Sequence, residues 1–150
     1  MKSLLLALLL LAPALFAQSY QEKIVAAVLV AEASSEGVRG MMAVAEVIGQ
    51  RAKDKGKTPL QVVTSGTGQR RAFSCLNGTT PEKLLQHWSK DANYDKALKI
   101  ALILTRQPER LGGLTNRATH YTRRQEKPYW AKGKKPVAVI GQHAFYRLDY

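Results

Sequence analysis

The strongest constraint on the fold is an apolar segment, residues 24–33, in which Glu32 is the only polar residue. Its apolar residues do not keep to one stripe, so a helix here would be buried on all sides. A second segment, residues 38–52, is also dense in small and branched apolar residues, with Glu46 and Gln50 among its few polar ones. Two such helices packed together predict the centre of an α-rich core.

Capping signals predict where further helices begin. Thr58 is followed by proline and then by Gln61, which together complete a capping box, and Thr80 is again followed by proline. Apolar residues at helical spacing predict another helix over residues 94–105. The glycine-, serine- and threonine-rich residues 64–80 are predicted to form a loop.

The pattern changes towards the C-terminus. Residues 117–122 and 137–148 are rich in β-branched and aromatic residues, and Gly141 and Gln142 fall between two strand-like runs, where a hairpin could turn. The sequence therefore predicts an α+β fold, mostly helical, with a small antiparallel sheet near the C-terminus. The chain has 150 residues and no internal repeat, which favours one domain.

The N-terminus reads as a secretory signal peptide. One lysine precedes a leucine-rich run, and small residues follow it. We expect residues 1–17 to be removed after Ala17, which leaves 18–150 as a single domain with no membrane span. An uncleaved N-terminal anchor is the alternative. A signal peptide means export, so we expect the domain to be secreted or to lie in the periplasm or cell envelope.

The composition limits the chemistry further. Cys75 is the only cysteine, so no internal disulfide can form; it is either a small buried residue or a nucleophile. The net charge of +12 favours polyanionic partners: wall polymers, anionic lipid or nucleic acid. Residues 117–135 mix basic and aromatic side chains, which suits nucleic acid, an anionic glycan or merely a solvated loop.

Glu32 is the leading candidate for chemistry. A carboxylate among apolar neighbours tends to have a raised pKa, and a glutamic acid that is partly protonated near neutral pH is what a general acid needs. Glycosidases use such a group to protonate the leaving oxygen. Glu36 would share its helical face only if the helix continued through Ser34 and Ser35. Alternatively, Glu32 leaves the helix end and meets solvent or an arginine.

The histidines are widely separated. His87, His120 and His143 form no closely spaced pair of the kind that zinc sites prefer. A three-histidine zinc site is possible but nothing in the spacing supports it, so no metal is expected. His120 is of more interest because it stands beside Tyr121 on a predicted strand.

Five motifs in this order resemble the SleB/CwlJ family of cell-wall hydrolases. The family pattern has an acidic pair, a glycine-led apolar helix ending in an amide–arginine pair, a Phe-Ser loop, a THY-like strand and a tail with tryptophan, histidine and aromatics. Here these are AEASSEG, GMMAVAEVIGQR, GQRRAFSC, ATHYT and PYWAKGKKPVAVIGQHAFYR. Each motif alone is weak, but five in the correct order carry the resemblance.

The resemblance implies a lysozyme-like fold that acts on the glycan strand of peptidoglycan, as a lytic transglycosylase. Glu32 would then protonate the oxygen between N-acetylmuramic acid and N-acetylglucosamine. As a base, it would next deprotonate the muramic C6 hydroxyl, which closes a 1,6-anhydro ring. One carboxylate suffices because the substrate's acetamido group can stabilise the positive anomeric carbon, and no cofactor is needed.

The resemblance also suggests which residues surround the sugar. Glu36 is expected in a supporting role, and Gln50 stands where the family has asparagine. Trp130 and Tyr146 are candidate stacking platforms, although core packing would explain both equally well. The expected sugar-binding or orienting residues are Glu36, Gln50, Gln69, Ser74, His120, Tyr121, Trp130 and Tyr146.

The expected partner is peptidoglycan rather than nucleic acid, and the expected state is a monomer. Three alternatives stay open at this point. The enzyme could be a muramidase that uses water, or a zinc-dependent wall amidase. The chain could also be a non-catalytic binder of polyanions or peptidoglycan.

Overall fold

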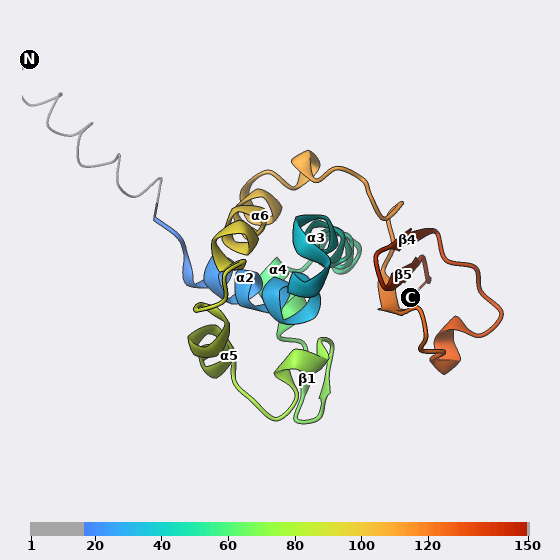
Figure 1. Cartoon of the computed structure of the whole chain (residues 1–150), viewed down its shortest axis with the longest axis horizontal. Coiled ribbons are helices and arrows are strands. Elements are labelled where there is room, and N and C mark those ends of the chain that lie inside the picture. Colours follow the sequence, from blue (N-terminus) through green and yellow to red (C-terminus); the bar gives the residue numbers. More distant parts are fainter. Residues whose placement is uncertain (1–16, 150) are drawn as a thin grey trace, which may run out of the picture.

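The computed structural model describes residues 17–149 of the chain (Figure 1). The expected signal peptide, apart from Ala17, lies outside these residues. No helix within 17–149 has both the length and the hydropathy to cross a bilayer. The α-helices are α2 (Tyr20–Ala33), α3 (Gly37–Lys55), α4 (Pro59–Val63), α5 (Pro81–Trp88) and α6 (Tyr94–Arg106).

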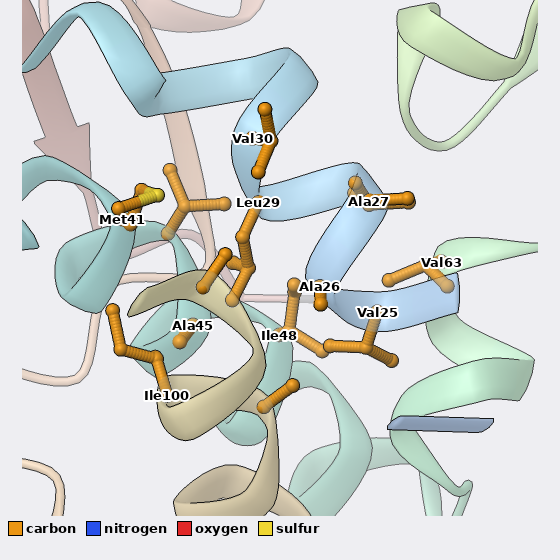
Figure 2. Packing of buried hydrophobic residues seen from close by; sticks show 14 of the residues in the cluster. Val25, Ala26, Ala27, Leu29, Val30, Met41, Ala45, Ile48, Val63 and Ile100 are labelled. Carbon is orange, nitrogen blue, oxygen red and sulfur yellow. The ribbon is translucent and has the colours of Figure 1, made fainter. Parts of the chain in front are cut away.

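Helix α2 is the central element of the helical body. Every residue from Ile24 to Val30 is buried, and α2 packs against each of α3, α4, α5 and α6. Figure 2 shows Leu29 of α2 among Met41 of α3 and Ile100 of α6. The prediction of a helix buried on all sides is confirmed, and the absence of a polar stripe is the reason.

The start of α2 is joined to the end of α6 by a buried carboxylate. Ser19 and Glu22 form a capping box, in which Glu22 accepts a 2.7 Å bond from the Ser19 backbone. Arg106 Nε also donates to Glu22 at 2.7 Å, and Thr105 Oγ1 donates at 3.1 Å. Burial alone would raise the pKa of Glu22, but these hydrogen bonds outweigh it and lower the pKa from 4.5 to about 2.

The apolar helices are separated by the expected break. Ser34–Glu36 form one 3₁₀ turn, and α3 starts at Gly37 with a φ of 67°. Gly40 lies so close beneath this turn that a Cβ there would be 2.2 Å from the Cβ of Glu36. Only glycine therefore lets the turn sit against α3, and Glu36 leaves the helical face of Glu32.

The C-terminal strands form the predicted antiparallel sheet. β3 (His120–Arg123), β4 (Ala138–Ile140) and β5 (His143–Tyr146) lie in the order β3-β5-β4. Gly141 and Gln142 make the turn between β4 and β5, as expected. This sheet packs beside α3 through a second, smaller core composed of Ala43, Val47, Ala118, Ile140 and Phe145. The α+β class is confirmed.

The prediction of a plain loop over residues 64–80 is wrong in part. A two-stranded hairpin, β1 (Gly66–Thr67) with β2 (Arg70–Arg71), interrupts it, and a 3₁₀ turn follows at Ser74–Leu76. Strands of two residues have no hydrophobic period that a sequence pattern could reveal. Phe73, buried between the hairpin and the turn, fixes the segment to the helical body.

The Glu22 contacts predict an acid-sensitive contribution to stability. Because the folded-state pKa is depressed to about 2, the contribution is complete above the unfolded-state pKa of 4.5 and is lost as pH falls towards 2. Glu22→Gln should lower the free energy of unfolding by about 1–3 kcal/mol at pH 7. Denaturant unfolding at pH 7 and pH 3 measures this. The exposed Glu109→Gln is the control, and equal losses in both variants would contradict the prediction.

Candidate functional site

A polar pocket of about 400 Å³ lies where the end of α2, the Ser74–Leu76 turn and the C-terminal sheet meet. Its walls come from three parts of the chain that are far apart in sequence. It collects two carboxylates, a phenol, a thiol, an imidazole and a guanidinium. The lining residues are Ala31, Glu32, Ser74, Cys75, Tyr121, Thr122, Arg123, Glu126 and His143.

Glu32 lies in the last turn of α2, half-buried at the pocket wall. Its partner is neither an arginine nor bulk solvent, because Tyr121 Oη donates a 2.7 Å hydrogen bond to Glu32 Oε2. The buried turns of α2 fix the backbone beneath Glu32, and β3 fixes Tyr121. The carboxyl group is therefore held in place from two sides.

Two groups beside Glu32, the Tyr121 phenol and the Cys75 thiol, stay protonated at neutral pH. Burial and then the charge of Glu32 raise the pKa of Tyr121 well above 10, although Arg51 acts in the opposite direction. Burial and the same carboxylate also raise the pKa of the Cys75 thiol far above its usual value of 9.0. Tyr121 is therefore a hydrogen-bond donor, and Cys75 lacks the thiolate that a nucleophile needs.

The structure brings three of the expected site residues together in this pocket: Glu32, Ser74 and Tyr121. Ser74 is exposed at the start of the 3₁₀ turn. Gln69 does not line the pocket, because it stands exposed at the β1–β2 turn with its amide beside Gly78.

Gln50, which was expected beside the same cleft, does not line this pocket. Its amide donates to Asp54 at 2.7 Å, and it lines a separate pocket of about 630 Å³ between α3 and α6. The next residue, Arg51, projects from another side of α3, since successive helical residues are about 100° apart. Arg51 Nε donates to Thr119 O at 2.6 Å, and its guanidinium lies 5.3 Å from the ring centre of Phe73. Arg51 thus joins α3 to the segment before β3.

Glu36 also lies outside the lining and instead supports the hairpin turn. Glu36 Oε2 accepts a 3.1 Å bond from the backbone of Gln142. The carboxylate fills the space beside Gly141, where a Cβ would come within 1.6 Å of Oε2. The second acid of the first motif therefore fixes the turn that leads into β5.

His120, Trp130 and Tyr146 meet each other on the opposite face of the sheet from the pocket. His120 precedes Tyr121 on β3, so its side chain points the other way. The rings of His120 and Tyr146 lie 5.3 Å and 5.5 Å from that of Trp130. Burial, then the charges of Arg51 and Lys55, lowers the pKa of His120 to about 4. Neutral His120 and its neighbours form an aromatic cluster apart from Glu32.

The sequence did not place the remaining lining residues beside Glu32, among them Glu126 and His143. Thr122 Oγ1 donates to Glu126 Oε2 at 3.0 Å, so this second carboxylate is held beside β3. His143 is 7% exposed. Strand alternation could have found it, because His143 is two residues before Phe145, which pairs with Tyr121. Glu126 had no comparable signal.

The structure does not gather the three histidines. His87 lies exposed on α5 against Trp88, whereas His120 and His143 lie on different strands of the sheet. Within residues 17–149, no three His, Cys, Asp or Glu side chains are placed so that they could hold a metal ion together.

Comparison with known proteins gives one result. A family model described as Cell Wall Hydrolase matches residues 35–146, well over half of the chain. The match covers Glu36, the Ser74 turn and the C-terminal sheet, and it begins three residues after Glu32. No curated protein and no solved structure matches the chain.

The contact between Glu36 and the hairpin predicts unequal effects of two glycine substitutions. Gly141→Ala and Gly133→Ala both place a side chain at positive φ, which costs about 1–2 kcal/mol. Only at Gly141 would the new Cβ also displace Glu36 from Gln142, which adds about 1 kcal/mol. Thermal unfolding of both variants measures the difference. Equal destabilisation would contradict a structural role for Glu36 at this turn.

Proposed function

The chain belongs to the Cell Wall Hydrolase family, and from that premise we propose that it cleaves the glycan strands of peptidoglycan with Glu32 as the acid/base. The observation that carries the proposal is the placement of Glu32. It lies at a polar pocket, at the end of a rigid buried helix, with Tyr121 Oη 2.7 Å from its carboxylate. A glycosidase needs a carboxyl group that is fixed beside the bond it protonates.

The proposed reaction is that of a lytic transglycosylase. Glu32 gives its proton to the oxygen between N-acetylmuramic acid and N-acetylglucosamine, while Tyr121 holds the other carboxyl oxygen. The acetamido group of the substrate stabilises the positive anomeric carbon. Glu32 then takes the proton of the C6 hydroxyl, whose oxygen forms the new bond of the 1,6-anhydro ring. The proton that Glu32 gives to the leaving oxygen is replaced by the one it takes from the C6 hydroxyl, and the bond from C6 oxygen to the anomeric carbon replaces the broken glycosidic bond. The reaction therefore consumes neither water nor a cofactor.

A muramidase is the second candidate, and Glu126 is the observation that favours it. This second carboxylate lines the same pocket as Glu32 and is oriented by Thr122. A pair of carboxylates allows a hydrolytic mechanism, in which one acts as acid and the other activates water or serves as nucleophile. The two candidates differ in their products, since hydrolysis leaves a reducing sugar.

The proposal also includes export of the domain and its attraction to the cell wall. A signal peptide at residues 1–17 would deliver the domain, 18–150, to the cell envelope, where it acts as a monomer. The net charge of +12 attracts an anionic wall. Part of that charge lies in residues 117–135, next to the aromatic cluster of His120, Trp130 and Tyr146. This sheet face is suited to hold more of the glycan strand outside the pocket.

Glu32→Gln tests the acid/base directly. The variant keeps size and polarity but cannot exchange the proton, so release of muropeptides from purified sacculi should fall about 10²–10⁴-fold. Tyr121→Phe should lower the rate of muropeptide release about 10-fold, as expected when one hydrogen bond to the carboxylate is lost. Circular dichroism verifies the fold, and Glu109→Gln is the matched control. A fully active Glu32→Gln would refute the assignment.

Mass spectrometry of the released muropeptides separates the two mechanisms. Anhydro ends are expected, with activity that survives Glu126→Gln because a transglycosylase needs only one carboxylate. Reducing ends, together with a large loss in Glu126→Gln, would establish the muramidase instead. Amide cleavage that EDTA abolishes would overturn both in favour of a zinc-dependent amidase.

A further inference from the structure

His143 lines the pocket and has a ring nitrogen without a hydrogen-bond partner among the described residues. The side chain is 7% exposed and lines the pocket with Glu32. Its Nδ1 is buried and finds no hydrogen-bond partner among residues 17–149. Buried side-chain nitrogens nearly always have a partner, so one without a partner in a pocket requires an explanation.

Packing alone does not explain a histidine at this position. The ring makes edge-to-face contacts with Tyr121 at 5.5 Å and Phe145 at 6.3 Å between centroids. A phenylalanine would make the same ring contacts without burying an unpaired polar atom. Nδ1 therefore needs a polar partner that residues 17–149 do not supply, and a group bound in the pocket that the imidazole lines could supply one.

We propose that His143 is a substrate-binding residue whose imidazole forms a hydrogen bond with a hydroxyl or N-acetyl amide of the sugar next to Glu32. The proposal rests on the proposed function, since it names a further group for the same reaction. An imidazole can donate or accept such a bond, which suits the mixed donors and acceptors of an amino sugar.

The geometry places His143 on the same wall as the acid/base. In the β3–β5 pairing, Tyr121 lies opposite Phe145, and Arg123 lies opposite His143. Residues two apart on a strand share a face, so His143 and Tyr121 point to the same side of the sheet. The 2.7 Å bond from Tyr121 then reaches Glu32. A sugar that contacts Glu32 in this pocket therefore lies beside the wall that carries His143.

The backbone of His143 is held independently of the pocket. Gln142, the residue before it, donates its N–H to Glu36 at 3.1 Å. Pairing with both β3 and β4 fixes the other side, because β5 is the central strand. The imidazole is therefore presented to the substrate from a rigid position, as a specificity-determining contact requires.

His143→Phe and His143→Asn separate binding from packing. Phenylalanine keeps the ring contacts and removes both nitrogens, whereas asparagine places an amide near the position of Nδ1. His143→Phe should retain the thermal unfolding temperature and lose about 10–100-fold in kcat/KM on soluble glycan strands, as expected for one or two lost hydrogen bonds. His143→Asn should recover part of that loss. His87→Phe, exposed on α5, is the control.

Binding provides a readout that does not need turnover. In the Glu32→Gln background, His143→Phe should weaken binding to sacculi about 10-fold, with His87→Phe unchanged. Full activity of His143→Phe, or equal binding with and without it, would overturn the proposal. A loss of folding in both His143 variants would do the same, since it would assign the histidine a structural role.

The two proposals fail in different ways. If Glu32→Gln stays active while His143→Phe binds sacculi weakly, the acid/base assignment fails and the binding role of His143 survives. If Glu32→Gln is inactive and His143→Phe keeps full activity, only the role of His143 is refuted.

Discussion

Burial of α2 on every side is the constraint on which the rest of the structure depends. Four helices surround residues 24–30, so α2 cannot shift without disturbing the entire core. Close-packed interiors allow few alternative positions. The last turn of α2 leaves the core at Glu32, so the packed helix fixes the position of the Glu32 backbone. The hydrogen bond from Tyr121 then ties the helical body to the C-terminal sheet and completes the pocket.

Three charged side chains form hydrogen bonds that connect separate helices, loops and turns of the fold. Glu22 joins α2 to α6, Arg51 joins α3 to the segment before β3, and Glu36 holds the β4–β5 turn. Each group is paired with a donor or acceptor from a distant part of the chain, which offsets the cost of removing it from water. The lone cysteine forms no bridge, so these contacts and the core must hold the fold without disulfides.

Local sequence signals predicted most of the helices and the C-terminal sheet, but they did not predict every element or contact. Capping residues fixed the starts of α4 and α5, and aromatic runs located the sheet. The β1–β2 hairpin was not predicted because its strands are too short to show a hydrophobic period. Gln50 lies at another pocket, whereas its neighbour Arg51 contacts the segment before β3, because one residue along a helix turns a side chain by about 100°. The lysozyme-like comparison stays a prediction.

The sequence by itself determined that α2 would be buried, that Glu32 would stand out within it, and that Tyr121 would lie on a strand. Such properties depend on residues close together in the chain, where helical and strand periods can be read directly. Only the tertiary structure decided which groups surround Glu32. Cys75 lies in the Ser74–Leu76 turn, Glu126 in the loop after β3 and His143 at the start of β5. Their meeting depends on packing over long sequence distances, which no local period records.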